Sequence, residues 1–167
     1  MSHQRIDPER VEPIRWSTRV STFTQILYHI VFSTKDREPC LTAERRPDLF
    51  RDIWGIISKH NAQLYRINGV QDHIHILSSL HPTVALSDFV KNIKLGSSSW
   101  IKSSEAFPGF RYWQDGYGAF TVSWSERNAL IEYIKNQEEH HRKTSFLEEY
   151  RALLKEAGID FEERYLT

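Results

Sequence analysis

Two histidines separated by one residue are the first feature of this 167-residue chain that suggests chemistry. His73 and His75 fall in the run HIHILSSL, whose composition is typical of a β-strand. Side chains alternate across a strand, so both imidazoles should face one side while Ile74 and Ile76 face the core on the other. Two imidazoles at this spacing form half of a site for a divalent metal. The alternative is a pair of half-exposed histidines on an amphipathic strand, since so short a motif often arises by chance.

Other enzyme classes that use a His-x-His pair need residues that this chain lacks. A histidine-triad nucleotide hydrolase needs a third histidine at the next alternate position, where Leu77 stands. An amidohydrolase needs a far longer, barrel-forming chain. A zinc site needs more cysteines or histidines at ligand spacing, and those are missing.

A tyrosine and a glutamine lie four residues apart in the stretch IEYIKNQEEHH, which we expect to be helical. This spacing places Tyr133 and Gln137 on one helix face, one turn apart. Gln137 offers a neutral amide oxygen as a third ligand for a hard divalent ion, and Tyr133 offers a phenol that can act as a nucleophile. The alternative for Tyr133 is ordinary packing, because it lies beside an apolar stripe. We assign no role to His140 and His141, which we expect to face solvent.

The elements that must position these residues follow from the apolar periodicity of the chain. The order is strand, helix, two strands, helix, strand, helix, helix, which is a split βαβ pattern. We therefore predict an α+β, ferredoxin-like fold, with an antiparallel sheet, helices on one face and extra C-terminal helices. The expected elements are a strand at 23–33, a helix at 43–60 capped by Thr42, a hairpin of 62–67 with 73–80, a helix at 88–102 capped by Ser87, a strand late in 107–124, a helix at 126–141 capped by Ser125, and a last helix that starts with a Ser145–Glu148 capping box and ends at Gly158.

Length and composition limit the class of protein. The chain suffices for one domain with a real core, so we expect a single domain at 22–167 preceded by an N-terminal arm at 1–21. The single cysteine, Cys40, excludes an intrachain disulfide and fits a reducing cytoplasm. No apolar run approaches the length that crosses a bilayer, so we expect no membrane partner. The first twenty residues also lack the apolar core of a signal peptide.

The distribution of charge points only weakly to nucleic acid. Lys plus Arg and Asp plus Glu balance at 22 each, whereas nucleic-acid-binding proteins usually carry excess positive charge. Acids dominate 138–163, which we interpret as a solvated outer surface. A basic stretch at 90–102 either contacts phosphates or is simply a solvated helix face. A nearby group at 111–113 either stacks on unpaired bases or packs around a glycine-rich loop. The basic group is Lys91, Lys94 and Lys102, and the stacking candidates are Arg111 and the aromatic residues Tyr112 and Trp113.

Four separated parts of the chain, taken together, resemble the HUH single-tyrosine transposases of the insertion-sequence-200/605 group. The likeness extends in order from about Thr22 to about Tyr165. The resemblance implies a ferredoxin-like sheet, a homodimer, and binding to hairpins in single-stranded DNA near the ends of a mobile element. The matching parts are YHIVFSTK at 28–35, DHIHIL at 72–77, WQDGYGAF at 113–120, and the pair Tyr133 and Gln137.

The resemblance also implies roles for individual residues. His73, His75 and Gln137 would hold a divalent cation, Mg²⁺ or Mn²⁺. Tyr133 would attack the scissile phosphate and leave a 5′-phosphotyrosine and a free 3′-OH. In this family the tyrosine often serves the metal site of the partner subunit, so we expect an active site shared across the dimer. Asp72 either orients a ligand histidine or closes the hairpin turn, and we favour the turn.

Two other functions stay open at this point. One is a non-catalytic binder of single-stranded nucleic acid on the same scaffold, which would not need all of the histidines, the tyrosine and the glutamine. The other is a host-serving nuclease that acts on repetitive extragenic hairpins with the same chemistry. The neutral charge and the polar leader also fit a domesticated descendant that no longer moves an element.

Overall fold

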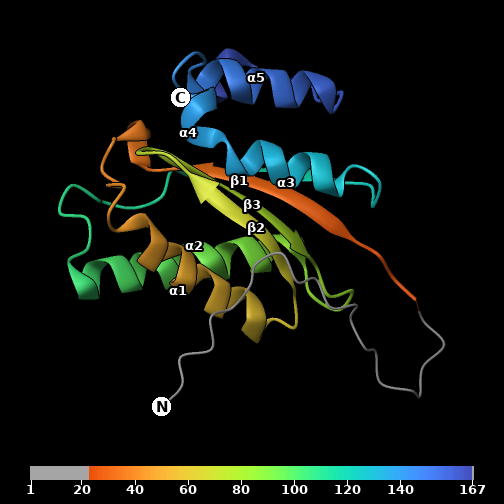
Figure 1. Cartoon of the computed structure of the whole chain (residues 1–167), viewed down its shortest axis with the longest axis horizontal. Helices are drawn as coiled ribbons and strands as arrows, with labels where there is room; N and C mark the ends of the chain where they lie inside the picture. Colours follow the sequence, from red (N-terminus) through yellow and green to blue (C-terminus); the bar gives the residue numbers. More distant parts are fainter. Residues whose placement is uncertain (1–22, 167) are drawn as a thin grey trace.

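A four-stranded antiparallel sheet with helices on both faces forms the centre of the computed structural model, which describes residues 23–166 (Figure 1). The N-terminal arm expected at 1–21 lies outside the described residues. No helix in the described part of the chain has the length and apolar character needed to span a bilayer. The elements are β1 (Leu27–Ser33), η1 (Lys35–Arg37), α1 (Arg46–Lys59), β2 (Leu64–Gly69), β3 (His73–Ser79), α2 (Leu86–Ser104), β4 (Gly118–Thr121), α3 (Arg127–Lys135), α4 (Gln137–His140), α5 (Phe146–Glu156) and η2 (Glu163–Tyr165).

The sheet has the strand order β2-β3-β1-β4, and all neighbours are antiparallel. The two helices α1 and α2 follow β1 and β3, so the order β1-α1-β2-β3-α2-β4 is the predicted split βαβ pattern. The predicted ferredoxin-like fold is therefore confirmed. β1 and β3 pair along their whole length, with Val31 opposite His75 and Phe32 opposite Ile74.

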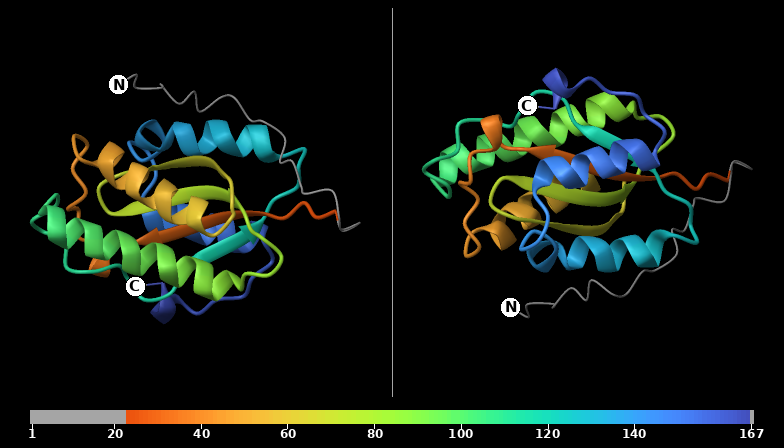
Figure 2. Two further views of the ribbon diagram at one scale, coloured as in Figure 1. Left: turned by 90° about the horizontal axis from the view of Figure 1, so that it is seen from below. Right: turned by 90° about the horizontal axis from the view of Figure 1, so that it is seen from above.

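The two faces of the sheet have different coverings. On one face, α1 and α2 pack over the main hydrophobic core, which includes Ile30, Phe32, Ile74 and Ile76. On the opposite face lie α3, α4 and α5, with a smaller cluster that contains Leu77. Seen from above in the right panel of Figure 2, α3 and α5 both extend over this second face. The extra C-terminal helices thus cover the face toward which the imidazoles of β3 point.

The helix predicted at 126–141 is interrupted in the structure. α3 ends at Lys135, and Asn136 adopts φ −94° and ψ 19° before α4 begins at Gln137. The amide of Asn136 donates to the carbonyls of both Glu132 and Tyr133, so the chain tightens at this point. The prediction of one continuous helix was wrong, and Tyr133 and Gln137 lie on opposite sides of the break.

The other helices begin close to their predicted positions. α1 begins at Arg46 because 43–45 form a turn, and Pro47 favours a helix start at its first turn. The predicted cap at Thr42 was wrong, because the N-cap of α1 is Arg45, and the Thr42 carbonyl accepts from the amides of Arg45 and Arg46 in the preceding turn. α2 begins at Leu86, before the predicted cap at Ser87.

The last helix follows its predicted signals at both ends. Ser145 and Glu148 form the predicted capping box at the start of α5. Gly158 adopts a left-handed conformation with φ +67°, and its amide donates to the carbonyl of Lys155 just after the helix ends.

Candidate active site

His73 and His75 lie side by side on β3, on the sheet face covered by α3, α4 and α5. Both side chains are fully buried, and the intervening Ile74 joins the core on the opposite face. The alternation predicted for this strand is therefore confirmed. The expected half-exposed alternative is wrong, because the C-terminal helices exclude solvent from both rings.

Each imidazole is held by a neighbour at its Nδ1 atom. Asp72 Oδ1 lies 2.6 Å from Nδ1 of His73, and His29 Nε2 lies 2.9 Å from Nδ1 of His75. The rings of His29 and His75 also stack, with their centroids 5.2 Å apart. Contacts of this kind fix the orientation of a ring and leave the Nε2 atom for another partner.

Asp72 combines the two roles that the sequence left open. It lies in the β2–β3 turn, and its backbone carbonyl accepts hydrogen bonds from the amide and the hydroxyl of Thr34, which links the turn to the end of β1. Its carboxylate holds His73. Our preference for the turn alone was therefore wrong.

Tyr133 and Gln137 reach the same volume from the opposite side. Gln137 is fully buried, and the Tyr133 ring centroid lies 6.1 Å from that of His75. Asn68 of β2 donates to the carbonyls of Ile134 and Lys135, which fixes the end of α3 against the sheet. The break at Asn136 therefore leaves both side chains directed toward the imidazoles of the same chain.

A carboxylate that we did not predict lies at the centre of this group. Glu149 on α5 is 3% exposed. Its Oε1 accepts hydrogen bonds from the hydroxyl of Tyr133 and, at 3.0 Å, from Nε2 of Gln137. Its Oε2 lies 3.5 Å from Nε2 of His73 and 3.3 Å from Nε2 of His75.

The sequence contains a signal for Glu149 that we overlooked. We assigned 138–163 to a solvated surface because acids dominate its composition. Within α5, however, Glu149 stands three residues after Phe146 and four before Leu153, and therefore on the helix face that these apolar residues define. An acid on such a face needs a buried partner.

His141 is a second residue whose place we did not predict. Its Nε2 lies 3.0 Å from Oε2 of Glu149, and its Nδ1 donates to the carbonyl of Thr144 at 2.8 Å. The side chain is only 10% exposed. The expectation that His141 faces solvent was wrong, because the turn between α4 and α5 directs its ring inward. His140 is more exposed, and its Nε2 lies 3.6 Å from Oε1 of Glu149.

The electrostatics of the cluster favour an ionised carboxylate and neutral phenol. Burial by itself raises the pKa of Glu149, but the imidazoles of His141, His73 and His75 around its carboxylate hold that pKa well below its usual range. Burial raises the pKa of Tyr133 above its usual range, and the hydrogen bond to Glu149 raises it further. Burial lowers the pKa of His75 to about 4. For His73 burial acts in the same direction, but its hydrogen bonds to Asp72 and Glu149 prevail and raise the pKa.

The cluster has the donors that a divalent cation needs. One ligand atom from each of His73, His75, His141 and Glu149 lies within 4.8 Å of the others. Nε2 of His73, Nε2 of His75 and Oε1 of Gln137 are buried and lack a well-directed hydrogen bond. A buried polar atom without a partner costs about 1–3 kcal/mol, so three of them at one place indicate a missing positively charged partner. The residues therefore fit a metal ion.

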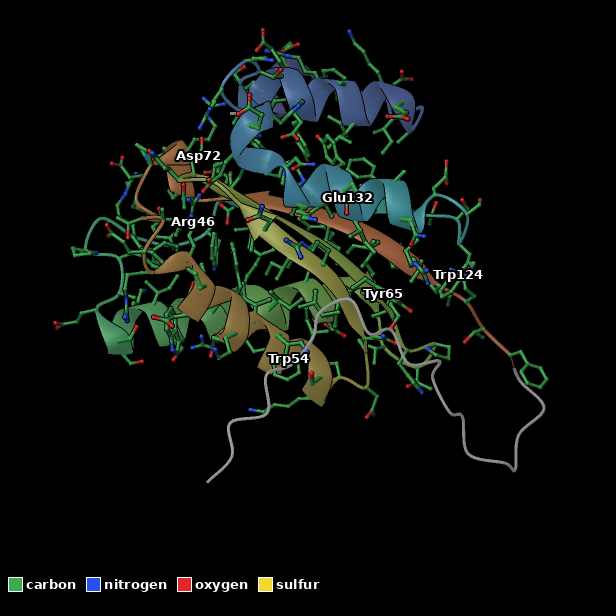
Figure 3. All side chains as sticks on the ribbon, viewed as in Figure 1. Arg46, Trp54, Tyr65, Asp72, Trp124 and Glu132 are labelled. Atoms are coloured by element: carbon green, nitrogen blue, oxygen red, sulfur yellow. The ribbon has the colours of Figure 1, made fainter. Side chains whose placement is uncertain are left out.

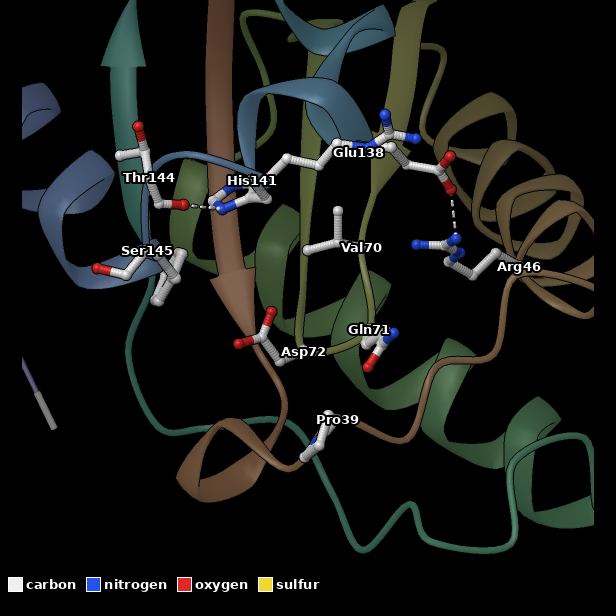
Figure 4. Close-up of a pocket in the computed structure, with 11 residues that line it drawn as sticks. Pro39, Arg46, Val70, Gln71, Asp72, Glu138, His141, Thr144 and Ser145 are labelled. Atoms are coloured by element: carbon white, nitrogen blue, oxygen red, sulfur yellow. Dashed lines mark hydrogen bonds and ion pairs between the residues drawn. The ribbon is translucent and has the colours of Figure 1, made fainter.

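A pocket of about 480 Å³ opens beside this cluster (Figure 4). It leads from Pro39 and Gln71 to Asp72 and His141, at the end of the sheet where β2 and β3 join. Arg46 and Glu138 also line the pocket and form an ion pair of 2.5 Å with each other. Figure 3 places Asp72 and Arg46 at this end of the sheet and Tyr65 and Trp124 at the opposite end.

Two of the expected DNA-binding residues have structural roles instead. Trp113 is 4% exposed, packs edge-on against Phe32 and donates from its indole nitrogen to Ser97. Its ring faces are covered, so the expected stacking on bases is wrong for this conformation. Lys94 donates to the carbonyls of Gln114 and Gly116, and it therefore holds the glycine-rich loop.

The remaining expected DNA-binding residues lie at the surface. Lys91 and Lys102 are exposed on α2. Tyr112 is 47% exposed, and Arg111 is exposed and pairs with Asp36 at 2.7 Å. None of them lies on the sheet face that carries the buried imidazoles.

Comparisons with known proteins agree with this fold. Residues 22–137 match the family described as "Transposase IS200 like". The ISDra2 transposase TnpA of Deinococcus radiodurans is 28% identical over 118 residues, which cover 68% of this chain and 84% of that protein. The transposase for insertion sequence element IS200 of Salmonella typhimurium is 26% identical over 141 residues, which cover 81% of this chain and 87% of that protein.

Two solved structures are similar to this chain. A candidate transposase from Deinococcus radiodurans R1 superposes with a TM-score of 0.57 at 25% identity, over 73% of this chain and 98% of that one. A REP-associated tyrosine transposase bound to a REP hairpin superposes with a TM-score of 0.55 at 12% identity, over 76% of this chain and 74% of that one. This likeness concerns the fold alone. Because the family match spans most of the chain and includes both imidazoles, the tyrosine and the glutamine, this protein belongs to the IS200-like transposase family.

Proposed function

We propose that this protein nicks and rejoins single-stranded DNA, with Tyr133 as the nucleophile and with His73, His75 and Gln137 as ligands of Mg²⁺ or Mn²⁺. The strongest support is that these four side chains converge on one buried carboxylate. The Tyr133 hydroxyl and the Gln137 amide both contact Glu149, the same carboxylate that lies 3.5 and 3.3 Å from the free Nε2 atoms of His73 and His75.

The proposed reaction exchanges one phosphodiester for another. The O–H bond of Tyr133 breaks, its oxygen bonds to the scissile phosphorus, and the P–O3′ bond breaks. The phenolic proton passes to Glu149 Oε1, which already accepts its hydrogen bond, and the departing 3′ oxygen takes a proton from water. The resulting 5′-phosphotyrosine retains the bond energy, so the strand can be rejoined without ATP.

A bound divalent cation would polarise the scissile phosphate and offset the negative charge that develops in the transition state. The residues around it keep the ligands in position. Asp72 and His29 fix the two imidazole rings through their Nδ1 atoms. Glu149 orients the Gln137 amide by accepting from its nitrogen, which leaves the amide oxygen free.

We propose hairpin-bearing single-stranded DNA as the substrate. The solved tyrosine transposase described above was bound to a REP hairpin, and the pocket beside Asp72 and His141 gives a path toward the buried cluster. For the surrounding strand we retain Lys91, Lys102, Arg111 and Tyr112 as candidate contacts, because they are exposed.

The homodimer expected from the family remains a proposal. A site shared between subunits is not required by the geometry, because one chain brings Tyr133 within hydrogen-bonding distance of Glu149 and its ring to 6.3 Å from that of His29. We therefore propose that the tyrosine acts on the metal site of its own chain in the conformation described.

The test is formation of a covalent adduct on a labelled hairpin-bearing strand with Mg²⁺ or Mn²⁺. Tyr133→Phe should abolish the adduct and the nick while it leaves DNA binding largely intact. Tyr65→Phe is the matched control, because Tyr65 packs against Trp124 at the far end of the sheet. Cleavage by Tyr133→Phe at the parental rate would exclude Tyr133 as the nucleophile.

A further inference from the structure

Two residues of the buried cluster, Glu149 and His141, lie outside the segment that matches the family. The match ends at residue 137, whereas His141 follows α4 and Glu149 belongs to α5. Both side chains nevertheless point into the cluster formed by His73 and His75. The C-terminal helices therefore contribute to the site as well as covering it.

The imidazoles of His73, His75 and His141 all direct their Nε2 atoms toward Oε2 of Glu149. The carbonyl of Thr144 only accepts, so Nδ1 of His141 carries a proton, and the carboxylate of Asp72 places a proton on Nδ1 of His73 in the same way. The Nε2 atom of each ring is then the one left to face the cluster. Nε2 of His141 and Nε2 of His73 therefore lie 3.0 and 3.5 Å from the same carboxylate oxygen.

A cation among these atoms accounts for the arrangement. A metal ion can accept imidazole nitrogens and a carboxylate oxygen together, and one ligand atom of each of these residues lies within 4.8 Å of the others. His75 adds a third imidazole, since its Nε2 lies 3.3 Å from Oε2 of Glu149 and has no well-directed hydrogen bond.

We propose that Glu149 and His141 are direct ligands of the cation, in addition to His73 and His75, and that this donor set selects Mn²⁺ over Mg²⁺. This inference rests on the metal site of the proposed function. Mg²⁺ prefers six oxygen donors and keeps several waters, whereas imidazole ligands favour first-row transition metals. Three imidazoles and one carboxylate, together with the amide oxygen of Gln137, therefore suit Mn²⁺ better than Mg²⁺.

Glu149 then connects the metal to the nucleophile. Oε2 faces the imidazoles, while Oε1 accepts from Tyr133 and Gln137. A ligand that contacts both groups fixes the phenol beside the cation within one chain. The family's histidines and glutamine alone provide no such connection.

The experiment is a titration of the metal-free full-length chain with Mn²⁺, followed by the electron paramagnetic resonance signal of free Mn²⁺, with and without millimolar Mg²⁺. We expect one bound Mn²⁺ per chain that Mg²⁺ displaces poorly. Glu149→Gln keeps the shape of the side chain and removes its charge, and it should weaken Mn²⁺ binding about tenfold or more. Glu156→Gln is the matched control, because Glu156 is exposed on the same helix.

A second variant keeps the test decisive if Glu149→Gln unfolds. His141→Ala removes a side chain at the end of α4 that is not part of the sheet, and it should also weaken Mn²⁺ binding about tenfold or more. Parental Mn²⁺ affinity in folded Glu149→Gln or His141→Ala overturns the inference. Equal affinity for Mg²⁺ and Mn²⁺ in the parent overturns it as well.

The same titration separates this inference from the proposed function. If His73→Ala loses Mn²⁺ while Glu149→Gln and His141→Ala retain it, only the added ligands are refuted. If the parent binds no Mn²⁺ and forms no adduct with Tyr133, both proposals fail.

Discussion

The hydroxyl of Tyr133 donates a hydrogen bond to Glu149, a residue sixteen positions later on a different helix. The same carboxylate receives the amide of Gln137 and lies against the imidazoles of His73 and His75. One buried acid thus joins the proposed nucleophile and the proposed ligands. It also keeps the phenol protonated, because it raises the pKa of Tyr133 beyond the effect of burial.

The carboxylate of Asp72 should tune the metal site through His73. Asp72→Ala removes the 2.6 Å contact to Nδ1 of His73 and leaves the backbone carbonyl that accepts from the amide of Thr34. Loss of such a partner lowers metal affinity by about 10- to 100-fold, so Mn²⁺ affinity should fall by that amount. Asp160→Ala, at an exposed position after α5, serves as the control. Unchanged affinity in Asp72→Ala would show that the ring needs no such support.

A mixture of two inactive variants tests whether the tyrosine acts within its own chain. His73→Ala lacks a ligand and Tyr133→Phe lacks the nucleophile, so a shared site would be restored in half of the positions of a mixed dimer. Because the cluster is complete in one chain, we expect cleavage by the mixture to stay at the level of the separate variants. Clear recovery of nicking after the two variants are unfolded and refolded together would favour exchange between subunits.

Trp113 and Tyr112 are neighbours with opposite expected phenotypes. Trp113→Ala removes a buried ring and its hydrogen bond to Ser97, and should lower the free energy of unfolding by about 3–5 kcal/mol. Tyr112→Ala, at a 47% exposed position, should change that free energy by no more than about 0.5 kcal/mol. If Tyr112 stacks on a base, its loss weakens binding to single-stranded DNA by about 1–3 kcal/mol. Denaturant titration and DNA-binding isotherms of both variants provide the measurements, and parental DNA affinity in Tyr112→Ala would remove it from the interface.

The thiol of Cys40 should react slowly and with a shifted pH dependence. Burial raises the pKa of the Cys40 thiol from its ordinary value of 9.0 to about 11. At pH 8 the thiolate fraction falls about 100-fold, and the greater nucleophilicity of a more basic thiolate recovers part of this, so alkylation should be about tenfold slower than in denatured protein. The rate should keep rising with pH up to about pH 11. A plateau near pH 9 in the folded protein would contradict the effect of burial.

The sequence determined the features that depend on neighbouring residues. Alternation along β3 placed His73 and His75 on one face, and the Ser145–Glu148 box marked the start of α5. The order of strands and helices was also sufficient for the ferredoxin-like topology, because short connections leave few ways to close a split βαβ sheet. These signals are local, and local periodicity survives in the folded chain.

Only the tertiary structure decided which distant side chains meet. The break at Asn136, the burial of Trp113 and the use of Lys94 by the glycine-rich loop all depend on contacts between segments far apart in sequence. The approach of Glu149 to β3 depends on such contacts too, whereas composition alone suggested that Glu149 is solvated. A buried charge is tolerated only where partners from other elements surround it. The sequence of α5 by itself does not predict which residues those partners are.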